Sequence, residues 1–141
     1  MNIATVLCAL LLLVMPAPPQ SGFVLVVNAA NPTESLTRDE VSRIFLKRQS
    51  KWAHGPAMTP VDLERTSSTR EAFTKSVHAR STGAIASYWQ QQIFSGREVP
   101  PPEMATEAEV LAHIRATPGA IGYVSAGASL GTGVRKVEVV K

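Results

Sequence analysis

Short apolar runs alternate with helix-length amphipathic segments along most of the chain. FVLVV at 23–27 and AIGYV at 120–124 are continuous apolar runs, which predict buried strands. Residues 134–140 alternate in part, as in a half-exposed strand, and a short strand is expected around 58–63. Because strands and helices alternate, the pattern predicts an α/β layer with a mixed or parallel sheet.

Helices are predicted at about 38–46, from about 67 onward, at 82–94 and from about 106 to 115. Three starts have the spacing of a capping box, namely Thr37 with Glu40, Ser68 with Glu71 and Thr106 with Glu109. The inner faces of the helices are marked by Val41, Ile44, Phe45, Phe73, Val77, Ile85, Tyr88, Trp89, Ile93, Val110, Leu111 and Ile114. Pro100 to Pro102 favour an extended turn before the last helix.

The first 22 residues carry no charged side chain, and Ile3 to Met15 are almost continuously apolar. This run has the length of a signal-peptide core and is too short to span a membrane. We therefore predict a signal peptide at 1–22, an exported, periplasmic location and one domain at 23–141. The alternatives are an uncleaved apolar N-terminus or a buried helix. Cys8 is the only cysteine, so the mature domain would lack thiol chemistry and cysteine-ligated zinc.

Charge along the chain is mildly basic and dispersed. The formal net charge is +3 over 141 residues, and the densest basic cluster is Lys47, Arg48 and Lys51 beside Trp52. Nucleic-acid binding requires a longer basic face with interleaved aromatic residues, so it is not expected. A small anionic ligand fits this charge better.

The segment from Val61 to Phe73 predicts a site for a tetrahedral oxyanion. A strand leads into a hydroxyl-rich helix start, where backbone N–H groups lack partners and the helix dipole attracts negative charge. The candidate anion-binding residues are Ser67, Ser68, Thr69 and Arg70, with Arg65 as a possible helper. In the alternative interpretation Ser68 only caps the helix and Arg70 points to solvent.

Other residues carry weaker signals. His54, His78 and His113 lack metal-ligand spacing, so we predict solvated or capping histidines and no metal or cofactor. The GxSxG elbow of a serine hydrolase is absent, so an enzyme is not expected. Acidic residues near the last helix are expected to complement its dipole, namely Glu103, Glu107 and Glu109. The aromatic side chains expected to pack internally, or to meet a protein partner, are Trp52, Tyr88 and Trp89.

A pattern spread over residues 24–139 resembles the phosphate-binding proteins of ABC importers. Its most specific piece is PGAIGYV at 118–124, and residues 67–70 are similar to the family's SGTR segment, which grips the phosphate at a helix start. The other matching positions are Val26, Val27, Asn28, Asn31, Pro32, Leu36, Thr37, Val41, Ile44, Phe45, Trp52, Gly55, Pro60, Val61, Phe73, Tyr88, Trp89, Phe94, Gly96 and Pro101. The resemblance implies a single lobe of the type 2 periplasmic-binding fold, a mixed sheet flanked by helices, which binds phosphate or a related oxyanion.

The chain also departs from the family pattern. Family members are about twice as long and close two lobes around the anion, whereas one lobe is expected here. The family's phosphate-gripping arginine precedes the serine by four residues, and that position is Leu63. Ser68 replaces the middle glycine of SGT. An ABC permease, a second copy or another envelope protein could complete the lobe. The alternative is an interaction or accessory module of the cell envelope that kept the lobe and lost the ligand.

Overall fold

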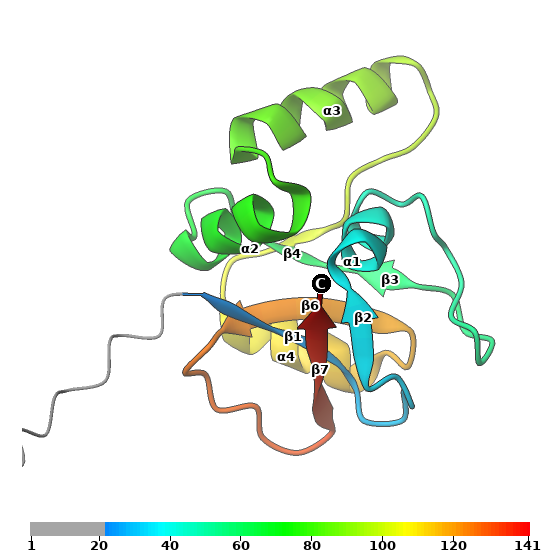
Figure 1. Ribbon diagram of the computed structural model, residues 1–141, viewed down its shortest axis with the longest axis vertical. Coiled ribbons are helices and arrows are strands. Elements are labelled where there is room, and N and C mark those ends of the chain that lie inside the picture. Colours follow the sequence, from blue (N-terminus) through cyan, green and yellow to red (C-terminus); the bar gives the residue numbers. More distant parts are fainter. Residues whose placement is uncertain (1–21) are drawn as a thin grey trace, which may run out of the picture.

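The computed structural model describes residues 22–141 (Figure 1), so the predicted signal peptide, except for Gly22, lies outside the described residues. The elements in chain order are β1 (Phe23–Asn28), β2 (Ser35–Thr37), α1 (Arg38–Phe45), β3 (Thr59–Pro60), β4 (Asp62–Leu63), α2 (Ser68–His78), α3 (Thr82–Phe94), β5 (Glu103–Met104), α4 (Glu107–Ala116), β6 (Ala120–Ser125) and β7 (Val134–Val140). The order agrees with the predicted α/β class.

The main sheet is mixed and has the strand order β2-β7-β1-β6-β3. The central strand β1 runs antiparallel to both β6 and β7, while the outer pairs β2 with β7 and β3 with β6 are parallel. The prediction of a mixed sheet flanked by helices is therefore confirmed. The strands predicted at 23–27, 120–124 and 134–140 are β1, β6 and β7.

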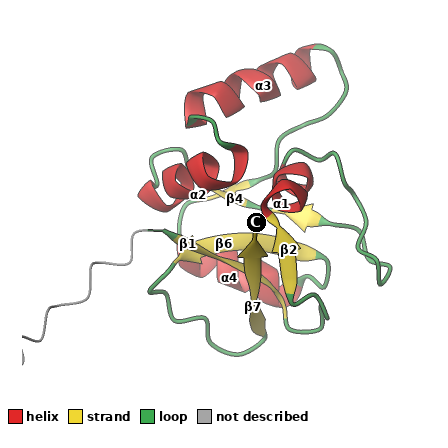
Figure 2. Ribbon diagram, viewed as in Figure 1, coloured by secondary structure: helices red, strands yellow, loops and turns green. Residues whose placement is uncertain are grey.

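Helices cover both faces of this sheet, as neighbouring residues of β6 show. A Cβ atom on Gly122 would meet Val110 and Ile114 of α4. The next side chain, Tyr123, stacks on Phe73 of α2 instead. Because successive strand residues point to opposite faces, α4 lies on one face and α2 on the other. Figure 2 shows the same arrangement, with α4 behind the strands and α3 furthest from the sheet.

The single strand expected at 58–63 is divided in two. β3 pairs with β6, whereas β4 pairs in parallel with β5 in a separate two-stranded sheet. Pro102 accepts the Asp62 amide in this second sheet. The segment Pro100 to Pro102 has no backbone N–H donors. Its Pro102 carbonyl therefore pairs with a donor from another part of the chain, the Asp62 amide.

Local sequence signals place the helices accurately. The capping boxes Thr37 with Glu40 and Thr106 with Glu109 are both present, and α3 has the predicted bounds 82–94. The box predicted at Ser68 is wrong, because Ser67 is the N-cap of α2 and its side chain accepts the Arg70 amide. That shift by one residue makes Ser68 the first residue of the helix.

The apolar core is divided into a large cluster and a small one. The large cluster joins the sheet to α1, α2 and α4, and it contains the stacked pair Phe73 and Tyr123. The small cluster holds α3 through Ile85 and Trp89, which pack against Leu46. Ile93, predicted on the inner face of α3, is 53% exposed, so that part of the prediction is wrong.

The motif PGAIGYV owes its two inner glycines to close packing. A Cβ atom on Gly119 would collide with the Ala57 carbonyl oxygen, and the Gly119 carbonyl accepts the Trp52 indole N–H at 2.9 Å. Gly122 leaves room for Val110. The motif therefore serves the packing of the lobe.

Within residues 22–141 no helix combines the length and the apolar character that a membrane crossing needs.

Candidate functional site

The start of α2 offers exposed donors, as the sequence predicts. Neither the Ser68 nor the Thr69 amide has a protein acceptor within the described residues, since the first turn of a helix leaves such groups free. Ser68 is exposed and Thr69 is half-buried. The Ser67 hydroxyl accepts the Arg70 amide at 3.2 Å and keeps its own proton to donate. These groups lie at the positive end of the helix dipole.

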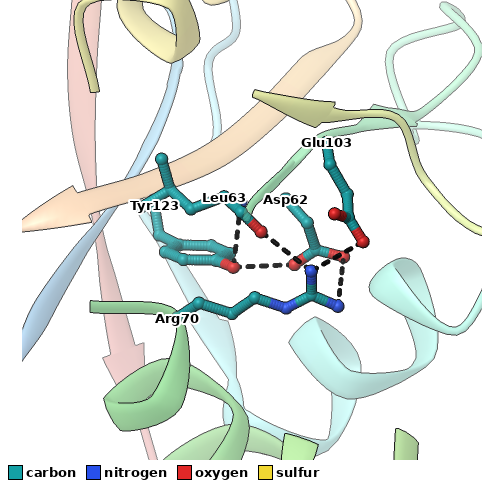
Figure 3. A network of polar contacts seen from close by, with 5 residues as sticks. All are labelled: Asp62, Leu63, Arg70, Glu103 and Tyr123. Carbon is teal, nitrogen blue, oxygen red and sulfur yellow. Dashed lines mark hydrogen bonds and ion pairs between the residues drawn. The ribbon is translucent and has the colours of Figure 1, made fainter. Parts of the chain in front are cut away.

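Arg70 does not point an unpaired charge toward solvent, and this corrects the predicted geometry. Its side chain turns inward and is 5% exposed. Figure 3 shows its guanidinium between two carboxylates, with Nη1 donating to Glu103 at 2.9 Å and Nη2 lying 4.0 Å from Asp62. Nη1 also donates to the Leu63 carbonyl at 2.8 Å. The positive charge of Arg70 is therefore already compensated from within the lobe.

Tyr123 completes this polar network from the sheet. Its hydroxyl donates to Asp62 Oδ1 at 2.7 Å and accepts the Leu63 amide at 3.2 Å. Burial raises the pKa of Asp62, although Arg70 and Tyr123 act in the opposite direction. Burial also raises the pKa of Tyr123 far above its ordinary value, and the Asp62 carboxylate adds to this. Burial alone would lower the pKa of Arg70, but Asp62 and Glu103 outweigh it and raise that pKa. The network thus keeps Tyr123 neutral and Arg70 charged.

Arg65 lies on the rim of a small pocket beside this network. The pocket has a volume of about 80 Å³, and α2, α3 and the proline-rich segment contribute to its wall. Its lining is Asp62, Arg65, Arg70, Ala86, Trp89, Gln90, Ile93, Pro100, Pro101 and Glu103. Arg65 itself is exposed. It is therefore the one predicted site residue whose charge faces solvent near the start of α2.

A second carboxylate reaches α2 from the start of α4. Glu107 Oε1 accepts the Ser125 amide at 2.6 Å and the Thr69 hydroxyl at 3.4 Å. Its Oε2 accepts the Ser125 hydroxyl at 3.0 Å. Glu107 was expected only to complement the dipole of its own helix. In the structure it also links α2, α4 and the end of β6.

The structure changes the interpretation of His78, which is neither solvated nor a cap. Its Nδ1 lies 2.8 Å from the Ser42 hydroxyl, and its ring meets Phe73 edge to face. Burial, with a smaller effect of Arg80, lowers the pKa of His78 to about 4. The ring is therefore neutral at pH 7 and joins α2 to α1. Within residues 22–141 no three His, Cys, Asp or Glu side chains are grouped to hold a metal ion.

The aromatic residues proposed for a protein contact lie mostly inside the lobe. Trp52 and Trp89 are buried, and Tyr88 is partly covered at the edge of the small cluster. The exposed aromatic side chain is Phe94 at the end of α3, which is 96% exposed. The spacing of apolar residues in the sequence does not reveal that Phe94 is exposed. Ile93 and Phe94 are both apolar, and the end of α3 where they lie has little to pack against.

The start of α2 is predictable from the sequence, whereas the partners of Arg70 are not. Asp62, Glu103 and Tyr123 come from β4, β5 and β6, and no local spacing links them to Arg70. The signal available in the sequence is Asp62 itself, an acidic residue between the apolar Val61 and Leu63 of an expected strand. A carboxylate that such a strand buries requires a cation or a hydrogen-bond donor nearby.

Comparison with known proteins identifies the fold. Residues 20–139 match the family model described as a PBP superfamily domain. The chain is similar in structure to an ABC-type phosphate transport receptor from Vibrio cholerae, with 21% identity and a TM-score of 0.65, covering 84% of this chain and 46% of that one. It is also similar to PstS from Borrelia burgdorferi, with 14% identity and a TM-score of 0.65, covering 83% of this chain and 46% of that one. None of the curated proteins compared with the chain matches it.

The chain thus spans less than half the length of these solved structures. The expected single lobe and the resemblance in fold are confirmed.

Proposed function

The chain belongs to the PBP superfamily, and from this premise we propose that it binds phosphate or a related oxyanion at the start of α2, without catalysing a reaction. The solved relatives named above are a phosphate transport receptor and PstS, and the likeness to them concerns the fold. The observation that carries the proposal is the free Ser68 and Thr69 amides, flanked by hydroxyls. An exported, periplasmic location and cooperation with an ABC permease belong to the same proposal.

The proposed ligands are the hydroxyls and amides of Ser67, Ser68 and Thr69, with Arg65 as the cation. Arg70 takes an indirect part, because its side chain is held by Asp62 and Glu103. A site on one lobe leaves the anion partly hydrated, so each hydrogen bond competes with water. We therefore expect weak binding by the lobe alone, and tighter binding when a second copy or another protein covers the open face.

Calorimetric titration of the purified protein with phosphate tests this proposal. Saturable heat at micromolar to low millimolar phosphate, abolished in the double variant Ser67→Ala and Thr69→Ala, is the expected result. Ser67→Ala also removes a helix cap, which costs about 1 kcal/mol of stability. Ser81→Ala is the matched control, because Ser81 caps α3 in the same way by accepting the Ala84 amide.

A single observation favours the alternative, an interaction module of the cell envelope. Ile93, Phe94 and Val99 are large apolar side chains that are all more than half exposed near the end of α3. Such a patch is typical of a surface that a partner covers. A folded protein that releases no heat up to tens of millimolar phosphate would contradict anion binding and leave the interaction module as the better interpretation.

A further inference from the structure

Three donors converge on the Glu107 carboxylate at the junction of α2, α4 and β6. They are the Thr69 hydroxyl, the Ser125 amide and the Ser125 hydroxyl, at 3.4, 2.6 and 3.0 Å. Glu107 is also the first residue of α4, where the dipole of that helix favours a negative charge. The lobe therefore already holds an anion, supplied by its own chain, at the start of α2.

This carboxylate uses a donor that an external oxyanion would need. The Thr69 hydroxyl has a single proton, which cannot serve Glu107 and a bound anion at the same time. An oxyanion that accepts this proton must displace Glu107 or lie close beside it. In the second case two negative charges are within a few ångströms of each other, at a partly buried site where water screens them incompletely.

Displacement of Glu107 would also expose two further donors. The Ser125 amide and hydroxyl both donate to Glu107, so both lose this acceptor when the carboxylate moves. Once the carboxylate swings away, both groups face the same space as the Thr69 hydroxyl. Ser125 is the last residue of β6 and pairs with Phe23 of β1, so its backbone is held in place by the sheet.

We propose that Glu107 is an internal competitor for the oxyanion site, and that Ser125 joins Thr69 as a ligand when Glu107 is displaced. This inference rests on the proposed function, because it assigns a regulation to the same site. In the unliganded lobe the Glu107 carboxylate then occupies the donors of the site. A partner that draws the Glu107 side chain outward would open the site without any movement of the sheet.

The experiment compares phosphate binding by the wild-type protein, Glu107→Gln and Glu109→Gln. Gln keeps the size of Glu107, and its carbonyl oxygen can still accept the Ser125 amide. The charge is lost together with one acceptor, because an NH2 group replaces the oxygen that accepts the Ser125 hydroxyl. Glu109→Gln removes the same charge from the same helix turn. The Glu109 carboxylate accepts the Ala105 and Thr106 amides, neither of which belongs to α2. Glu107→Ala is the second variant, in which the whole side chain is absent, and thermal unfolding confirms that each variant is folded.

The expected result is phosphate affinity at least about tenfold higher in Glu107→Gln and in Glu107→Ala, with Glu109→Gln within about twofold of the wild type. Adding Thr69→Val to Glu107→Gln should abolish the gain. If the wild type and the three single variants bind phosphate equally, the inference about Glu107 is overturned while the proposed function stands. An equal gain in Glu107→Gln and Glu109→Gln also overturns it, because the effect would then reflect net charge. If every folded variant fails to bind, the proposed function fails and this inference fails with it.

Discussion

The helices α2 and α3 are packed very differently. Toward the sheet, Phe73 is fully buried and stacks on Tyr123 with ring centroids 3.9 Å apart, and it also contacts Phe45. α3 is held instead by a small cluster, in which its Ile85 and Trp89 pack against Leu46 just after α1. The lobe therefore has a large continuous core and a small satellite core.

This difference predicts two levels of stability in one short chain. A segment with few buried apolar contacts opens at a lower free energy than the global unfolding of the lobe. We expect α3 to open while the sheet, α1, α2 and α4 stay folded. The proposed anion site lies on the stable side of this division, because α2 begins between β4 and the end of β6.

Phe73→Ala should cause the largest loss of stability. The change removes a fully buried ring that stacks on Tyr123, so we expect the free energy of unfolding to fall by about 3–5 kcal/mol. Urea unfolding followed by circular dichroism measures this. Phe23→Ala is the control on the same face, because Phe23 meets Phe73 edge to face but is only half-buried. Equal losses in both variants would mean that the stacked pair is not the centre of the core.

Arg70→Met should have the next largest effect. It leaves the Asp62 carboxylate buried without a cation, at a cost of about 3 kcal/mol at pH 7. Because burial already raises the pKa of Asp62, the variant can relieve the unpaired charge by taking up a proton. The cost is therefore present at neutral pH and decreases as the pH falls toward the raised pKa of Asp62. Unfolding by urea at pH 7 and pH 5 tests this direction.

The double variant Asp62→Asn and Arg70→Met separates charge from packing. If the unpaired carboxylate causes the loss, the double variant is more stable than Arg70→Met at pH 7, since Asn can still accept the Tyr123 hydroxyl proton. A double variant that is no more stable than Arg70→Met would show that Arg70 acts through its packing alone.

Local signals in the sequence fix most of the elements but not the charge network. The caps at Thr37 and Thr106 and the apolar runs of β1 and β6 each lie within a few residues, and all four predictions are confirmed. The partners of Arg70 come from strands 8 and 33 positions away, so their convergence depends on the parallel pairing of β4 with β5. The role of Glu107 depends likewise on where β6 ends. Contacts of this kind follow from the tertiary fold and leave no periodic signal.

Trp89→Ala should affect α3 and leave the sheet unchanged. Trp89 is 5% exposed in the satellite core, and its loss removes most of what holds α3. The loss of stability cannot exceed the free energy needed to open α3 locally. We therefore expect a loss of about 1–2 kcal/mol rather than the 3–5 kcal/mol typical of a buried Trp. Amide hydrogen exchange should show faster exchange in α3 with unchanged protection in β1 and β6. Equal loss of protection in the sheet would mean that the two cores unfold together.

Phe94→Ser should have the smallest effect on stability, although it changes an aromatic residue of the same helix. Phe94 is 96% exposed, so replacing it removes almost no buried area and should shift the free energy of unfolding by no more than about 0.5 kcal/mol. Its contrast with Trp89, five residues earlier, separates the face of α3 that holds the helix from the end that is free for a partner. A loss above about 1 kcal/mol would show that Phe94 folds back onto the lobe in solution. A protein that keeps its stability but loses self-association in sedimentation would place Phe94 in an interface between copies of this chain.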